Sequence, residues 1–169
     1  MLNSHSHRAA IVVAILTLVT AGAAVAATPL GGKKYAGTTS QKVNGYAAPV
    51  KFTVSGNRKQ LRGFQYGDVG CFVSIIPAGN PYLQAAWVHR IGTIAVSKGT
   101  FSIKNVKTVY SVTVAGGKLR TVTTTTVSGT FKTAKKATGK ITLFQSQTAP
   151  GLNHSCPKVV TRTFTATTH

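Results

Sequence analysis

The chain of 169 residues is long enough for one domain, and it contains 20 Lys and Arg residues against a single acid, for a formal net charge of +19. Because Asp68 is that only acid, sites that need several carboxylates are excluded, including two-carboxylate glycoside hydrolases, aspartic proteases and calcium or magnesium sites. A fold does not require such an imbalance, whereas its summed field attracts polyanions and anionic surfaces.

The first residues follow the pattern of a secretory signal peptide. The amino-terminal end is basic, Ile11–Val19 is an apolar run shorter than a membrane span, and Ala24–Ala27 offers small residues at the cleavage positions. We expect residues 1–27 to be removed and residues 28–34 to form a flexible leading segment before a single domain at 35–169. The protein is then secreted, extracellular or associated with the cell envelope, without a later transmembrane segment.

The rest of the chain alternates apolar and polar residues and is rich in Thr, Val, Ile and aromatic side chains, which predicts strands. Glycine-containing turns divide the strands into hairpins. Leu61 and Phe64 are out of phase by one residue, so we expect a β-bulge at Gly63. The predicted hairpins turn at Ser55–Arg58, Ser97–Gly99, Ala115–Lys118 and Ala134–Ala137, and the chain closes with a strand at 157–168.

Two segments between these hairpins read differently. Cys71–Pro77 is a nearly continuous apolar strand. Pro77–Arg90 contains two prolines, little alternation and the only tryptophan, so we expect a long loop. Trp87 either caps an open end of the fold or contributes to binding together with Arg90.

Many short strands with regular turns indicate an antiparallel sandwich or barrel, and we expect a jelly-roll-like β-sandwich of about eight to ten strands. The two cysteines, Cys71 and Cys156, read as one disulfide in an exported protein. Together with His89 and His154 they also offer zinc-ligand types, but without the usual ligand spacing. We expect no metal and no cofactor.

The densest basic stretch is FKTAKKATGKI, Phe131–Ile141. Alternation predicts that Val127, Phe131 and Ile141 are buried. Its lysines either guard a sheet edge against aggregation or form, with Trp87 and Arg90, a patch that binds an anion. These predicted exposed lysines are Lys132, Lys135, Lys136 and Lys140.

Several segments together resemble uncharacterised exported β-sandwich proteins of high-G+C Gram-positive bacteria. They are YAGTTSQ, VKFTVSGNRKQL, the strand cysteine Cys71, IAVSKGTFS, VSGTFKTAKKATGKI and a final Cys followed by FTA, in that order along most of the mature chain. The resemblance implies a sandwich fold, export and a disulfide, and it implies no catalytic residue. The hairpin from Val106 to Thr126 and the segment around Trp87 extend beyond the usual pattern.

The leading hypothesis is a non-enzymatic binding module that engages an anionic cell-envelope polymer. A structural or surface protein whose charge only keeps it soluble is the first alternative. The second is a small hydrolase that uses His89 or His154 with a serine or cysteine, although no G-x-S-x-G elbow or phosphate-binding loop is present. The basic residues are interleaved with aromatics that alternation places in the core, so we expect no specific nucleic-acid recognition. The sequence does not define an oligomeric state.

Overall fold

A computed structural model describes residues 25–43, 46–68, 87–114, 117–149, 152–155 and 159–168. These residues form an all-β fold in which every strand pairing is antiparallel. The strands are β1 (Lys34–Val43), β2 (Tyr46–Val54), β3 (Gln60–Asp68), β4 (Trp87–Ser97), β5 (Thr100–Val114), β6 (Gly117–Thr133), β7 (Lys136–Ala149), β8 (Leu152–Ser155) and β9 (Val160–Thr167).

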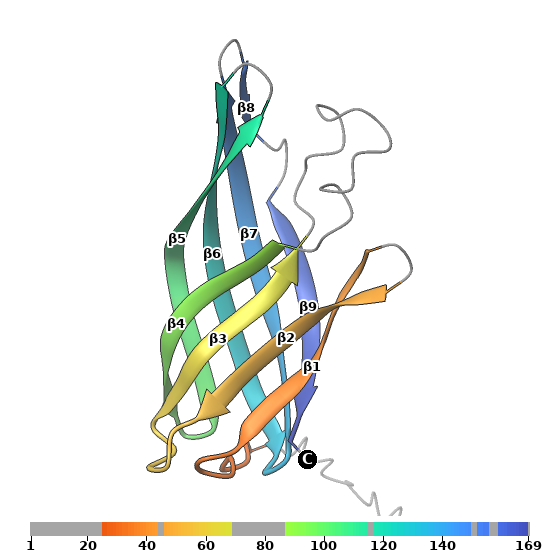
Figure 1. The fold of residues 1–169 in the computed structure, drawn as a ribbon. Helices are drawn as coiled ribbons and strands as arrows, with labels where there is room; N and C mark the ends of the chain where they lie inside the picture. Colours follow the sequence, from red (N-terminus) through yellow and green to blue (C-terminus); the bar gives the residue numbers. More distant parts are fainter. Residues whose placement is uncertain are drawn as a thin grey trace, which may run out of the picture.

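The sheet closes on itself to form a barrel (Figure 1). Strands β1 to β7 pair in chain order, and β9 then pairs with β7 on one side and with β1 on the other. The short β8 lies outside this ring and pairs only with β7 among the described strands. The predicted β-sandwich is therefore wrong. Two packed sheets would each have edge strands, whereas here β9 pairs with both β1 and β7 and closes the sheet into a ring.

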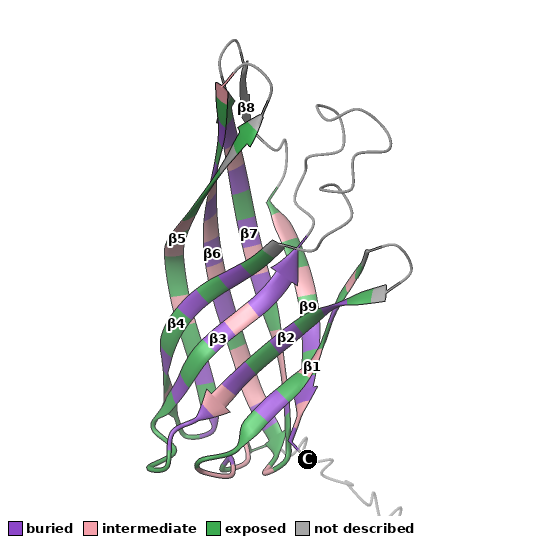
Figure 2. Ribbon diagram, in the orientation of Figure 1, coloured by how far each residue is buried: buried purple, intermediate pink, exposed green. Residues whose placement is uncertain are grey.

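Buried and exposed residues alternate along the strands (Figure 2), and the buried apolar side chains form one core inside the barrel. Aromatic rings form its centre: Phe52 stacks on Tyr35 at a ring-centroid distance of 5.2 Å and on Phe64 at 5.6 Å. Phe131, fully buried, meets Phe101 edge-on at 5.6 Å. Each such ring contributes about 1.5–3 kcal/mol by leaving water.

Two glycines make room for these rings. Gly129 of β6 and Gly139 of β7 are register partners on the inward face. A Cβ at Gly129 would lie 2.3 Å from the Phe101 ring, and one at Gly139 would lie 2.6 Å from the Phe164 ring. The Phe101 and Phe164 rings therefore pack directly against the backbone of these two glycines.

The predicted hairpins at Ser55–Arg58, Ser97–Gly99 and Ala134–Ala137 are confirmed as the β2–β3, β4–β5 and β6–β7 connections. Strands β5 and β6 also pair as predicted, up to Val114 and Gly117, with the tip of their turn outside the described residues. The bulge is confirmed: the β3–β4 register shifts between Leu61 and Phe64, where Gly63 has a φ of 60°.

Other expectations need correction or fall outside the described part of the chain. Trp87 and Arg90 do not lie in a loop but open strand β4, whose residues pair with Asp68 to Gln65 of β3. The predicted strand at 71–77 and the remainder of the predicted loop lie outside the described residues. Cys71 and Cys156 both lie there too, so the expected disulfide has no support in the structure.

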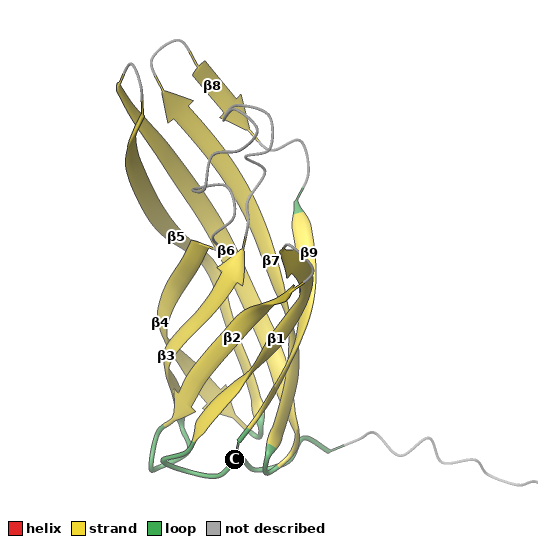
Figure 3. Cartoon of the chain, turned by 45° about the vertical axis from the view of Figure 1, so that its right-hand side comes forward, coloured by secondary structure: helices red, strands yellow, loops and turns green. Residues whose placement is uncertain are grey.

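The two ends of the barrel differ (Figures 1 and 3). The β2–β3, β4–β5 and β6–β7 turns, the start of β1 and the end of β9 all lie at the lower end of these views. At the upper end β5, β6 and β7 extend beyond β3 and β4. The lower half of the interior is apolar, whereas polar side chains face inward in the upper half.

Candidate functional site

Polar residues of three long strands line the upper interior in ladders. The strand register aligns them in rows, because directly opposed residues of neighbouring strands point to the same side of the sheet. One row contains Thr108, Thr123 and Gln145, and the next contains Tyr110, Thr121 and Gln147. In both rows the β6 and β7 members are buried.

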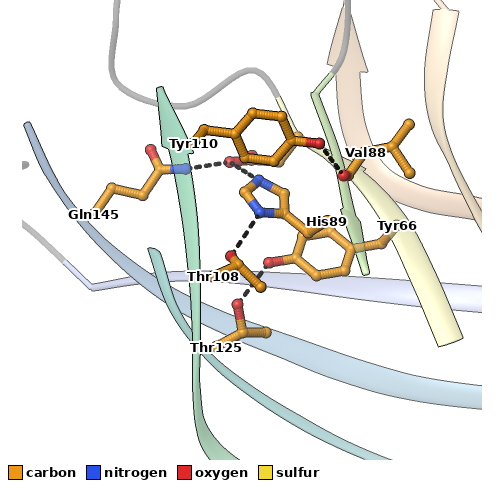
Figure 4. Close-up of polar contacts among 8 residues, drawn as sticks. Tyr66, Val88, His89, Thr108, Tyr110, Thr125 and Gln145 are labelled. Atoms are coloured by element: carbon orange, nitrogen blue, oxygen red, sulfur yellow. Dashed lines mark hydrogen bonds and ion pairs between the residues drawn. The ribbon is translucent and has the colours of Figure 1, made fainter. Parts of the chain in front are cut away.

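Strands β3 and β4 complete this buried polar cluster from the opposite wall (Figure 4). Tyr66 and His89 are register partners whose rings stack at 4.9 Å. Gln145 donates a hydrogen bond from Nε2 to Asp68 Oδ2 at 3.0 Å. The Tyr66 hydroxyl and the Thr125 hydroxyl lie 2.8 Å apart. The cluster therefore ties the β3–β4 wall to the β6–β7 wall across the barrel.

The same cluster spans a gap in the barrel wall. Backbone pairing between β4 and β5 is confined to Val96–Phe101 and Ser97–Thr100, next to their turn. Farther up, side chains replace it: the Tyr110 hydroxyl donates to Val88 O at 2.7 Å, and His89 Nδ1 lies 3.3 Å from Thr108 Oγ1. These contacts hold two strands together where their backbones do not pair.

Burial controls the ionisation of this cluster. Burial lowers the pKa of His89, and the Asp68 carboxylate opposes that shift from 4.0 Å. Burial also raises the pKa of the Tyr66 hydroxyl, so this group stays protonated. Burial thus favours the neutral form of His89, which stacks on Tyr66 and contacts Thr108.

This geometry gives no support to a hydrolase that uses His89. The ring is fully buried, so a substrate cannot reach it in this conformation. Its described polar neighbours are a threonine hydroxyl and a carboxylate, and the 4.0 Å separation of Nε2 from Asp68 exceeds hydrogen-bond length. A serine or cysteine nucleophile beside His89 is absent from the described residues. The side chain of His154, the other candidate, lies outside the described ones.

Some buried polar atoms of this region have no hydrogen-bond partner within the described part of the chain. They include both amide atoms of Gln147, Thr121 Oγ1 and His89 Nε2. The upper interior therefore contains polar atoms that the described residues do not satisfy, in contrast to the closely packed aromatic core below it.

The outer surface carries the charge. Lys132, Lys135, Lys136 and Lys140 are exposed, and Val127, Phe131 and Ile141 are buried, which confirms the predicted faces of this hairpin. All other described lysines and arginines are also exposed, except Arg162, which is partly buried. Asp68, the only acid of the chain, is 2% exposed. No Asp or Glu side chain therefore offsets the positive charge outside the barrel.

Bases from four segments of the chain meet at the lower end of the barrel, and we call this set the basic rim. Backbone hydrogen bonds hold the segments together: Gly32 N donates to Val54 O, Val96 N to Lys59 O, Phe131 N to Gly99 O, Leu30 N to Ala134 O and Thr168 N to Lys135 O. The basic rim consists of Lys33, Lys34, Arg58, Lys59, Lys98, Lys132, Lys135 and Lys136, all exposed. Sequence analysis identified only the three residues of the β6–β7 hairpin, because the turns that bring in the others are far apart in the chain.

Shallow grooves run from this end along the outer wall. One, of about 710 Å³, lies over β4 to β7 and is lined by hydroxyl residues such as Ser128 and Thr130 together with Lys132 and Lys140. A second, of about 480 Å³, lies between β7, β9 and β1 on the other side of Lys140. Lys140 thus stands between two hydroxyl-lined grooves just above the basic rim.

The remaining predicted site residues are not part of this surface. Arg90 is exposed on β4 beside the gap toward β5, and the Trp87 side chain is not among those described. The zinc-ligand set suggested by His89, His154 and the cysteines also falls largely outside the described residues. Within them, no group of three or more His, Cys, Asp or Glu residues is placed to hold a metal ion.

Comparison with known proteins adds no assignment to this geometry. The described part of the chain contains no helix long and apolar enough to cross a membrane. No protein-family model, no curated protein and no solved structure matches the sequence.

Proposed function

We propose that this protein is an exported, non-enzymatic binding module whose basic outer surface engages an anionic polymer of the cell envelope. The observation that carries the proposal is the separation of charge in the fold. Exposed bases occur along the whole outer wall, while the one acid is buried inside the barrel. Such a surface has a field of a single sign, which concentrates polyanions around it.

The charge is not required by the fold. The core is apolar and aromatic, and the polar cluster that contains the one acid lies inside the barrel. Like charges at this density oppose compaction. A surface that carries only bases is therefore better explained by a partner than by stability.

A salt series tests the proposal. The full chain is applied to isolated cell envelopes and to an immobilised polyanion, and retention is measured between about 50 and 200 mM NaCl, a range over which phosphate contacts weaken steeply. We expect retention at low salt that is lost across this range. Lysine acetylation is the control and should abolish retention at low salt. Retention that is unchanged by salt and by acetylation would contradict the proposal.

A structural protein whose charge only confers solubility is the alternative. The presence of bases at the upper end as well, at Lys42, Lys118 and Arg120, favours it. Under this alternative the protein stays unbound on envelopes even at the lowest salt concentration.

A further inference from the structure

We propose that the basic rim is the main binding surface and that it holds a flexible polymer of phosphodiester groups; this inference rests on the function proposed above. The rim is the place where the fold gathers bases from distant parts of the sequence. Its eight residues come from the start of β1 and from the β2–β3, β4–β5 and β6–β7 turns. The backbone hydrogen bonds between these segments fix the turns from which the basic side chains project, so binding need not order the backbone.

Two rim residues occupy left-handed positions in hairpin turns, where glycine or asparagine is the usual residue. Arg58 has a φ of 62° and Lys98 a φ of 47°. In this left-handed region Gly and Asn are favoured and most other residues cost energy. Both positions are exposed turn tips, so packing does not explain a long basic side chain there. A bound anion does explain it.

The composition of the rim suits a flexible polyanion, and we choose phosphodiester groups because lysine is a common phosphate ligand. Seven of its eight residues are lysines and one is an arginine. A lysine ammonium is a compact point charge that binds phosphate without a fixed orientation, whereas the arginine fork suits fixed, bidentate pairing with either carboxylate or phosphate. A polymer whose charges lie along a flexible chain suits a ring of independent point charges. Lys140 and the hydroxyls of the adjoining grooves extend this surface up the wall.

The first experiment compares two sets of substitutions that remove equal charge. The rim set is Lys59→Gln, Lys98→Gln, Lys132→Gln and Lys135→Gln, and the control set is Lys42→Gln, Lys51→Gln, Lys104→Gln and Lys107→Gln, all at exposed positions. Binding of the full chain to fluorescent poly(glycerol phosphate) is measured by anisotropy at several NaCl concentrations. Circular dichroism melts confirm that both variants fold.

We expect the rim set to lower the affinity at least tenfold more than the control set. Each lost phosphate contact reduces the slope of log K against log salt by about 0.7, so the rim set should reduce it by roughly 3 and the control set by much less. Equal losses of affinity in the two variants would contradict the basic rim as the main binding surface but would not contradict the proposed function. Failure of the unsubstituted protein to bind any polyanion would overturn both.

Two further arms test the chemistry. Oligothymidylate has the same phosphodiester groups from a nucleic acid, and binding to it at comparable affinity supports recognition of the shared chemistry. Poly-L-glutamate carries carboxylates, and binding as tight as to poly(glycerol phosphate) would overturn the choice of phosphate.

A single substitution tests the role of Lys98. Because asparagine tolerates the left-handed backbone better than lysine, we expect Lys98→Asn to have an unchanged or higher melting temperature together with weaker binding. A lower melting temperature with unchanged binding would contradict the role given to Lys98.

Discussion

At the residue scale, His89 links the fold to pH. Because burial lowers its pKa in the folded state, the unfolded chain binds a proton more readily below the ordinary histidine value of about 6.5. Its contribution is complete above that value and is lost as pH falls toward the folded-state pKa. We expect the free energy of unfolding to decrease from about pH 7 to pH 5, measured by urea titration at each pH.

His89→Gln is the matched variant for this prediction, because Gln keeps polar atoms but does not titrate. It should flatten the dependence of the unfolding free energy on pH over that range. The absolute stability of the variant is not diagnostic, since it also loses the stack on Tyr66. Parallel pH profiles for the two proteins would show that another group is responsible.

The β6–β7 hairpin separates packing from charge within a few residues. Phe131 is fully buried among Tyr35, Phe52 and Phe101, so Phe131→Ala should lower the free energy of unfolding by about 3–5 kcal/mol. Replacing the exposed Lys132, Lys135, Lys136 and Lys140 by Gln should change it by less than about 0.5 kcal/mol each. Thermal and urea melts measure both. A large loss from the lysine variant would mean that these side chains stabilise the hairpin.

At the element scale, the glycine pair Gly129 and Gly139 leaves the space in which aromatic rings of the core pack against β6 and β7. A Cβ at Gly139 would lie 2.3 Å from Ser128 O and 2.6 Å from the Phe164 ring. Gly139→Ala should therefore destabilise the fold by about 1–3 kcal/mol through overpacking. Gly56→Ala is the control, because a Cβ there has no atom within 4 Å and its backbone is not left-handed. Similar melting temperatures for the two variants would refute this account of the pair.

The sequence predicts the strands correctly where apolar alternation is strong. The Gly63 bulge followed from one out-of-phase apolar pair, Leu61 and Phe64. The inward threonines of β6 were not accessible, because TVTTTT has threonine on both faces and its pattern cannot distinguish Thr123, which is buried, from Thr124. Likewise, a lone Asp68 and His89 gave no sign that β3 and β4 would bring them within 4.0 Å.

At the scale of the whole molecule, the sandwich prediction was wrong because apolar alternation shows which face of a strand is buried but not which strands pair with each other. Strands of a sandwich and of a barrel have the same inward and outward pattern; what distinguishes them here is that Phe164 and its neighbours in β9 pair with both β1 and β7. That closure depends on the longest sequence separation in the fold. The basic rim was missed for the same reason, since its bases become neighbours only after the barrel closes.

The distribution of charge over the whole molecule makes a last prediction about stability in simple salt. In most proteins salt screens attractive surface ion pairs as well as repulsions, whereas here the single acid is buried and the exposed charges of the described chain are all bases. Lowering the Debye length from about 30 Å at 0.01 M to about 8 Å at 0.15 M NaCl should relieve mainly repulsion. The melting temperature should therefore rise over this range.

The rim variant with four Lys→Gln substitutions provides the control for this prediction. If repulsion is concentrated where the turns converge, that variant should melt at a higher temperature than the unsubstituted protein in 0.01 M NaCl and should gain less from added salt. The control set, with its four lysines on the barrel wall and upper end, should fall between the two. Chloride is used because phosphate or sulfate would also bind the rim and stabilise the fold by mass action. A melting temperature that falls with added NaCl would mean that attractive charge pairs outweigh repulsion, and it would remove the physical basis for a surface built to meet an anionic partner.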